Sequence, residues 1–285
     1  MKLRLLAGAL LLIVPTAALA ADNRFERTLN VSAQPDLYVS TSSGDITVHA
    51  GSDNQIHVVG RVHAGWSVFG MSAVESIIQQ VQANPPIVQD GNAVRIGITG
   101  DKGRGVSIDY DVTVPTGVAL NLHSISGDIV VNHVGRYLSA SSSSGDIRAH
   151  GISGPADLST ASGDIELEQT GQGDVKAKSG SGDMKIHGLN GSLTARDGSG
   201  DISADGRLVG GGNLANGSGD IRLHLPADAR FNLEASTGSG DIHINFPGAP
   251  RQDDGSRHHL TASIHGGGAT LEVRTGSGDV EIDNH

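Results

Sequence analysis

Carboxylates that recur in one fixed setting are the first residues in this sequence that could do chemistry. The tripeptide Ser-Gly-Asp occurs nine times, and from Asp128 to Asp241 its copies are 18, 18, 19, 18, 19 and 21 residues apart. Its aspartates are Asp45, Asp128, Asp146, Asp164, Asp183, Asp201, Asp220, Asp241 and Asp279. Carboxylates in such a row can bind calcium, act as an acid–base pair on a sugar, or accept hydrogen bonds from turn amides.

Turn capping is the role that the spacing favours. Glycine suits a backbone position with positive φ, and the serine and aspartate beside it can accept hydrogen bonds from turn amides. The turn glycines are Gly44, Gly127, Gly145, Gly163, Gly182, Gly200, Gly219, Gly240 and Gly278. Stacked carboxylates about 4.8 Å apart repel by roughly 1 kcal/mol per pair in water, so we expect turn amides to offset them. We expect insertions to interrupt the ladder of turns.

Calcium binding is the alternative role for these carboxylates. The candidate ligands are Asp146, Asp164, Asp183, Asp201 and Asp220. Carboxylates in glycine-rich turns also occur in the nonapeptide calcium roll, which has one residue between glycine and aspartate and another before the apolar residue. Here Gly44-Asp45-Ile46 and its copies are contiguous. We therefore predict no resident cofactor and no metal site, with calcium as the alternative.

Catalysis on a polysaccharide is a weaker alternative. Glycoside hydrolysis needs one pair of carboxylates about 5 to 9.5 Å apart, set in a cleft. Here a carboxylate recurs in every repeat and the returns between repeats are short, so the pattern does not single out one active site. The sequence also lacks a Gly-x-Ser-x-Gly elbow and a His-Glu-x-x-His pair. We therefore predict that the protein is not an enzyme, and we assign no catalytic residue.

Histidines form a second regular set, four residues after the turn aspartate, at His49, His150, His187 and His224. In the regular array they fall in alternate repeats, roughly 9.6 Å apart, which is too far for two of them to share a zinc ion. We therefore expect solvated surface residues. The pair His258-His259, in the segment from Pro247 to His259, is a weaker metal candidate.

The elements that carry these residues are predicted from the apolar pattern. After each turn aspartate the first and third residues are apolar, as in Ile165 and Leu167, and the eighth and sixth residues before it are mostly apolar too, as in Val175 and Ala177. Such alternation indicates two half-buried strands per repeat. Because so few inward residues cannot form a core alone, successive repeats must stack. The sequence predicts an all-β solenoid with about 18–19 residues per coil. An immunoglobulin-like sandwich is disfavoured, since its strands do not repeat one tripeptide in fixed phase.

The flanks of the repeat array differ from its centre. We predict one domain over residues 21–285, with first strands at 37–60, an insertion at 61–105, regular coils at 106–246, and an insertion and last coil at 247–285. The insertion should contain a helix at about 71–83, covering the N-terminal end of the solenoid or binding a partner. The final strand should be an open edge guarded by Glu281 and Asp283, which predicts a monomer.

The N-terminus predicts export. Residues 1–20 contain a short basic region, about ten apolar residues and the small-residue site Ala18-Leu19-Ala20, which together are typical of a secretory signal peptide. No later apolar run is long enough to span a bilayer, which needs roughly 20 residues. We expect a periplasmic, extracellular or cell-surface location.

Composition limits the remaining function classes. The chain has no cysteine, so neither disulfides nor a thiol nucleophile is possible. The formal net charge of −11 argues against nucleic-acid binding, which requires clustered Lys and Arg. The 41 glycines and 3% aromatic residues suit a thin repetitive core better than a thick globule.

With these motifs in view, the chain resembles the bacterial putative-adhesin family, exported β-solenoids of unknown function. The resemblance rests on Leu37 to Ile46, the helical insertion, Tyr110 to Pro115 and the Ser-Gly-Asp-Ile ladder. It implies a right-handed β-helix and provides no catalytic residues. We therefore expect a non-catalytic envelope or surface module that presents a rigid acidic face to an unknown protein or glycan. The alternatives are a calcium-stabilised scaffold and a polysaccharide-cleaving enzyme.

Overall fold

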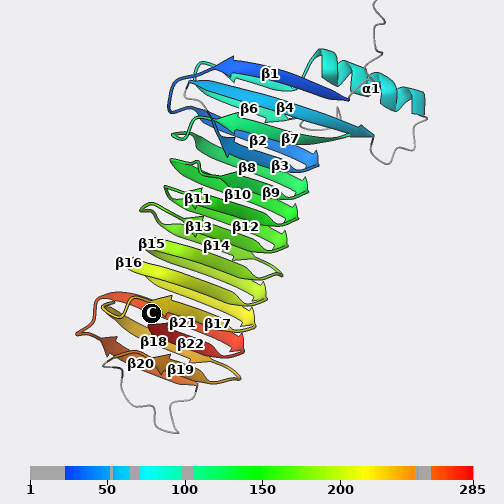
Figure 1. The fold of residues 1–285 in the computed structure, drawn as a ribbon. Coiled ribbons are helices and arrows are strands. Elements are labelled where there is room, and N and C mark those ends of the chain that lie inside the picture. Colours follow the sequence, from blue (N-terminus) through cyan, green and yellow to red (C-terminus); the bar gives the residue numbers. More distant parts are fainter. Residues whose placement is uncertain are drawn as a thin grey trace, which may run out of the picture.

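The protein is a β-solenoid shaped as a flattened rod (Figure 1). The computed structural model describes residues 23–51, 54–64, 71–97, 106–247, 249 and 258–284. Over these residues it contains one helix and 22 strands, and the strands form a single sheet that winds around the rod. The predicted signal peptide at 1–20 lies outside the described residues. The one helix formed by these residues lacks the length and hydrophobicity that crossing a bilayer requires.

Each coil contributes one strand to each of two faces. In spatial order, face A consists of β5 (Ile87–Asp90), β6 (Ala93–Gly97), β2 (Asp36–Ser43), β8 (Ala119–Ser126), β10 (Tyr137–Ser144), β12 (Ala156–Ser162), β14 (Val175–Ser179), the end of β15 (Met184–Ser199), the end of β16 (Ile202–Ser218), β21 (Ala269–Ser277), β18 (Phe231–Thr237) and β20 (His259–Ile264). The pairings are parallel except where β5 and β20 join.

Face B follows the same order of coils. It consists of β1 (Arg24–Asn30), β4 (Gln55–Ala64), β7 (Val106–Val114), β3 (Ile46–Ala50), β9 (Ile129–Asn132), β11 (Ile147–Ile152), β13 (Ile165–Gln169), the starts of β15 and β16, β17 (Ile221–Leu225), β22 (Val280–Asn284) and β19 (Ile242–Asn245). Its antiparallel pairs are β1 with β4 and β4 with β7.

The core is the column of inward side chains between the two faces. The predicted alternation is confirmed, because β13 buries Ile165 and Leu167 while Glu166 and Glu168 point outward. In register, Ile165 lies between Ile147 and its counterpart in β15, so each coil packs on the next. Aliphatic side chains suffice because the interior is thin, which explains why so few aromatic residues are needed.

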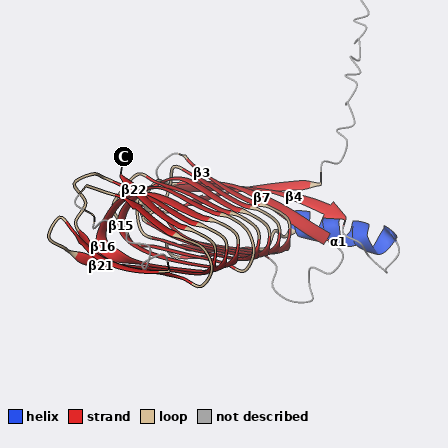
Figure 2. Ribbon diagram, turned by 90° about the horizontal axis from the view of Figure 1, so that it is seen from below, coloured by secondary structure: helices blue, strands red, loops and turns tan. Residues whose placement is uncertain are grey.

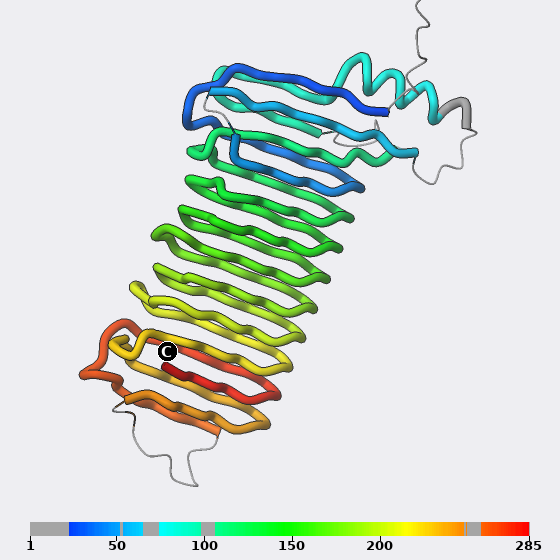
Figure 3. The backbone as a smooth tube through the Cα atoms, in the orientation of Figure 1, coloured from blue at the N-terminus to red at the C-terminus, as the bar shows by residue number. Residues whose placement is uncertain are grey.

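The spatial order of the coils departs from the chain order at both ends of the rod. The coil of β2 and β3 lies between the coil of β6 and β7 and that of β8 and β9. At the other end, β21 and β22 lie between the ends of β16 and β17 on one side and β18 and β19 on the other. The tube in Figure 3 shows the red C-terminal strand inside the stack, with the orange segment beyond it.

This order corrects the prediction for the last strand. Glu281 and Asp283 were expected to guard an open edge, but β22 is hydrogen-bonded to β17 on one side and β19 on the other. The outermost strands at that end are β19 and β20. An inserted strand satisfies the backbone groups on both of its edges, whereas an added outer strand would leave one edge unpaired. Monomeric state stays a prediction.

The helix α1 (Met71–Ala83) confirms the helical prediction near the N-terminal end. It packs Val74, Ile78 and Val81 toward β4 and β7. Figure 2 shows it beside the end of the rod. The outermost strands there are β1 and β5, so antiparallel strands rather than the helix complete the stack.

Candidate binding site

The turn aspartates form one continuous ladder of hydrogen bonds. In each coil the aspartate backbone N–H donates to the Oδ1 of the aspartate in the preceding coil, at 2.8–3.0 Å. The spatial order is Asp109, Asp45, Asp128, Asp146, Asp164, Asp183, Asp201, Asp220, Asp279 and Asp241. Turn amides therefore offset the carboxylates, as expected. The expected interruption is wrong, because the inserted coils close every gap and Asp109 adds a tenth member.

The turn glycines are fixed by two constraints. All nine have φ between +124° and +147°, which L residues rarely adopt. The stacked turns also approach closely, since a Cβ on Gly163 would lie 2.3 Å from the Gly145 carbonyl oxygen. Glycine is therefore required both by the conformation of one turn and by the stacking of the next.

Two arginines supplement the amides. Arg148 contacts Asp128 at 3.3 Å and Asp146 at 2.6 Å, and Arg222 contacts Asp201 at 3.0 Å and its neighbour Asp220 at 2.6 Å. The amide of the next coil and then Arg222 lower the pKa of Asp201. These carboxylates therefore serve the stacking of coils. Within the part of the chain that the structure describes, no three His, Asp or Glu side chains are arranged to hold one metal ion.

We predict that Asp164 acts as a turn cap. Asp164→Asn keeps the acceptor and should change the free energy of unfolding by less than about 1 kcal/mol, whereas Asp164→Ala should cost about 0.5–2 kcal/mol. Urea denaturation would measure both, with Asp157→Ala as a control, since this outward aspartate of β12 belongs to no ladder. Equal losses for Asn and Ala, together with calcium stabilising only the wild type, would favour the calcium scaffold instead.

The histidines of face B alternate with acids in neighbouring coils. The column runs His150, Glu168, His187, Asp205, His224 and Asp283. His187 Nδ1 lies 2.5 Å from Asp205 Oδ2, and His150 Nδ1 lies 3.7 Å from Glu168 Oε2. The intervening acids were not anticipated, although they occupy the same position of the repeat. His49 contacts Asp111 at 3.7 Å, and His258 and His259 are exposed at the start of β20.

A second ladder lies on the inner side of the turns. The residue four positions before the turn aspartate donates its side chain to a backbone carbonyl of the preceding coil, in most coils that of the turn glycine. The donors are Thr41, Ser124, Ser142, Thr160, Ser179, Asn216, Thr275 and Thr237. The one exception is Asp197, which is 7% exposed and whose Oδ2 has no partner. Burial raises the pKa of Asp197.

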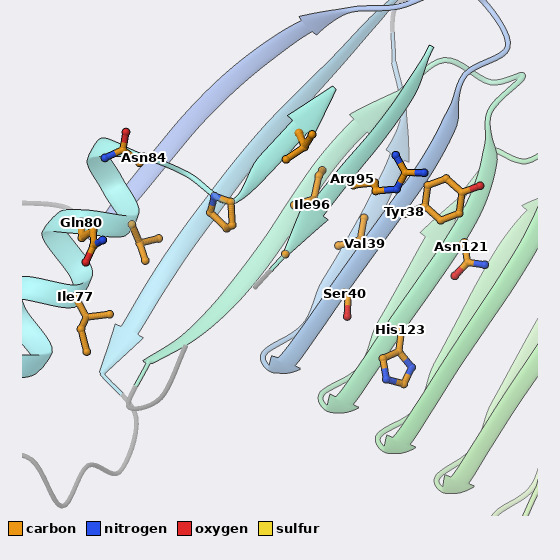
Figure 4. Close-up of a pocket in the computed structure, with 14 residues that line it drawn as sticks. Tyr38, Val39, Ser40, Ile77, Gln80, Asn84, Arg95, Ile96, Asn121 and His123 are labelled. Carbon is orange, nitrogen blue, oxygen red and sulfur yellow. The ribbon is translucent and has the colours of Figure 1, made fainter. Parts of the chain in front are cut away.

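A cleft of about 1040 Å³ lies between α1 and face A at the N-terminal end of the rod (Figure 4). The helix contributes Ile77, Gln80 and Val81 to one wall, and Asn84 follows directly after its last residue. The strands β6, β2 and β8 contribute the outward side chains Arg95, Tyr38, Ser40, Asn121 and His123 to the other. The Arg95 guanidinium lies 5.2 Å from the centre of the Tyr38 ring.

Sequence reasoning did not identify this cleft, which depends on segments far apart in the chain. Tyr38 and Arg95 become neighbours only because β2 pairs with β6 in register. One usable signal was present. Tyr38 occupies an outward position of a strand, where the other coils mostly have small or charged residues.

Comparisons with known proteins concern the chain as a whole and do not address the cleft. The family described as Toastrack DUF4097 matches residues 49–283. No curated protein matches the chain.

Two solved structures resemble the chain. A "putative cell adhesion protein" from Clostridium sporogenes is 11% identical, with a TM-score of 0.27, and the match covers 92% of this chain and 100% of that one. A "putative adhesin" from Bacteroides fragilis is 14% identical, with a TM-score of 0.34, and the match covers 92% and 97%. Likenesses at these TM-scores are too weak to assign a function.

Proposed function

Since this chain belongs to the Toastrack DUF4097 family, whose function is unknown, we propose that it is an exported, non-catalytic binding module of the cell envelope or cell surface. Its solenoid is a rigid spacer with an acidic turn ladder. Its ligand binds in the cleft between α1 and face A. Export is supported by the signal-peptide pattern of residues 1–20.

The observation that carries this proposal is that the outward side chains at the N-terminal end of face A differ from those of the central coils. Along the central coils of face A the outward positions next to the turn hold Ser141, Ser159 and Lys178. At the N-terminal end an aromatic ring, a guanidinium, an imidazole and several amides line one concave surface. Concave sites with a few converging polar groups are where ligands bind, and positions that the fold does not demand are free to serve them.

The absence of catalysis is supported by what the repeated carboxylates do. Each turn carboxylate except that of Asp241 accepts the amide of its neighbour, so it contributes to the stacking of coils. The cleft itself is lined by no carboxylate among the described residues. Glycoside hydrolysis needs two such groups on either side of the scissile bond.

We test the cleft by filling it. Ser40→Trp adds a large side chain within the cleft, and Ser159→Trp makes the same change at the matching outward position of β12. We expect Ser40→Trp to weaken binding of the mature protein to cell envelopes by about tenfold or more, and Ser159→Trp to have little effect. Cosedimentation of labelled protein with purified envelopes measures both.

Two results would contradict the proposal. If both variants bind envelopes as the wild type does, the cleft is not the binding site. If the wild type releases soluble fragments from the envelopes over time, the protein is a catalyst. Fractionation of cells that produce the full chain tests export separately, and a cytoplasmic, uncleaved product would contradict it.

A further inference from the structure

Two of the three tyrosines of this chain lie on face A with only one coil between them. Tyr38 in β2 is 40% exposed and Tyr137 in β10 is 42% exposed, whereas the third, Tyr110, is buried. From this pair and the neighbouring Arg95 we infer that the cleft and the adjoining part of face A bind an acidic polysaccharide. This inference rests on the proposed function and specifies its ligand.

The strand register fixes how the two rings are placed. β8 lies between β2 and β10, and Tyr38 aligns with Asn121 while Tyr137 aligns with Ala119. The two tyrosines are thus two strands apart and offset by two residues, which places their Cα atoms about 12 Å apart. Both side chains point out of the same face, because their neighbours Leu37 and Leu138 are fully buried.

The rings suit a saccharide because each presents an exposed apolar surface beside polar side chains. One face of a pyranose ring carries C–H bonds that pack on the negative face of an aromatic ring, while its hydroxyls point to the rim. Around the tyrosines lie Asn121, Ser139 and His123, whose amide, hydroxyl and imidazole can bond to hydroxyls. Two such rings in one row fit successive parts of an extended chain.

Arg95 indicates an acidic ligand. Among the described residues that line the cleft, Arg95 is the only Lys or Arg, and none is a carboxylate. Within the described residues Arg95 forms no ion pair, and its guanidinium lies over the Tyr38 ring. Two acids lie opposite Ala93 in the strands on either side of β6: Asp36 is paired with Arg136 at 3.2 Å, and Asp90 is exposed. An exposed guanidinium without a partner can bind a carboxylate through two parallel hydrogen bonds.

A protein partner fits these observations less well. Energetically important residues of protein interfaces cluster in closely packed pockets that exclude water. Here the two rings are separated by the small residue Ala119, and the side chains between and beside them on β8 and β10, Asn121, His123 and Ser139, are polar.

The test compares an acidic polymer with its neutral ester, which shares the same backbone, and adds two other acidic polymers. The mature protein is run in native gels containing polygalacturonate, its methyl ester, alginate or hyaluronate. We expect the acidic polymers to retard the wild type with an apparent affinity about tenfold higher than the ester does. Tyr38→Ala and Tyr137→Ala should each weaken binding of acidic polymer by about tenfold. Arg95→Gln should remove only the preference for the acid.

Matched controls use exposed residues of the same face. Ile125→Ala removes an apolar side chain that is 49% exposed at the end of β8, and Arg196→Gln removes an exposed arginine of β15. Neither should change retardation. Retardation by none of the three acidic polymers, or equal retardation of the tyrosine variants and the wild type, would overturn the inference.

Envelope binding separates this inference from the proposed function. If Ser40→Trp abolishes envelope binding while Tyr137→Ala and Arg95→Gln leave it intact, the cleft is the binding site but its ligand is not an acidic polysaccharide. If protease treatment of the envelopes removes the binding, the partner is a protein and the saccharide is again wrong. Binding that survives protease and falls with Tyr137→Ala supports the inference.

Discussion

Ile165→Asp is expected to destabilise the solenoid by several kcal/mol, enough to unfold its centre. Ile165 is 1% exposed and lies in register between Ile147 and Met184, which are fully buried. The inward residues beside it in β13 and in the adjacent coils are aliphatic or Met, and the Thr160 hydroxyl on the inner side of the turn already donates to the Gly145 oxygen. A carboxylate there would either stay charged without a partner or take up a proton, and both cost free energy.

The matched control places the same side chain one residue away. Glu166 points outward from β13, so Glu166→Asp should change the free energy of unfolding by less than about 0.5 kcal/mol. Urea denaturation followed by circular dichroism measures both variants. Melting of Ile165→Asp like the wild type would show that the inward and outward registers are interchanged.

The regular part of the fold could be predicted because each coil repeats the same local constraint. Glycine at Gly163 and its counterparts marks the turn, and the alternation in residues such as Ile165 and Leu167 shows which side is buried. These two signals fix the phase of every strand relative to its turn. The register between coils then follows, since a shift by one residue would expose the entire apolar row.

The order of the coils could not be predicted from the same signals. Strands with the same apolar pattern can pair equally well with one another, so periodicity does not determine which coils are adjacent. It therefore could not show that Asp45 stacks on Asp128, or that Asp241 stacks on Asp279. That choice depends on long segments between the coils and on which order leaves fewest strand edges open. The cleft was missed for a related reason, because its walls come from α1 and β6, which lie outside the repeat.

Asp197→Asn is expected to stabilise the protein, which is unusual for a change at a buried site. Asp197 occupies the position of the inner ladder where other coils donate to a carbonyl of the preceding coil, and the counterpart in the next coil, Asn216, donates to the Gly200 oxygen at 2.7 Å. A carboxylate cannot donate, so Asp197 Oδ2 is buried without a partner, and no described side chain donates to the Gly182 oxygen. Asparagine would supply the missing donor.

The pH dependence of this effect follows from the raised pKa of Asp197. Burial, together with the charges of Asp183 and Asp201 on either side, disfavours the ionised form in the folded state. A carboxyl whose folded pKa is raised destabilises the fold when ionised, so its penalty is complete above the folded pKa and disappears as the pH falls toward the unfolded value near 4. A protonated Asp197 could itself donate.

Denaturation at two pH values tests this reasoning. At pH 7 we expect Asp197→Asn to be more stable than the wild type by about 1–3 kcal/mol, the usual cost of a buried polar group without a partner. The difference should shrink at pH 4, because protonation of the wild-type carboxyl increases as the pH falls. Asp164→Asn is the control, since its exposed carboxylate already accepts the Asp183 amide at 2.8 Å and is not one of the charges that act on Asp197, so it should show no such gain. A loss of stability in Asp197→Asn at pH 7 would contradict this prediction. It would show that the carboxylate has a partner in solution, such as a cation bound between Asp197 and the Gly182 carbonyl oxygen.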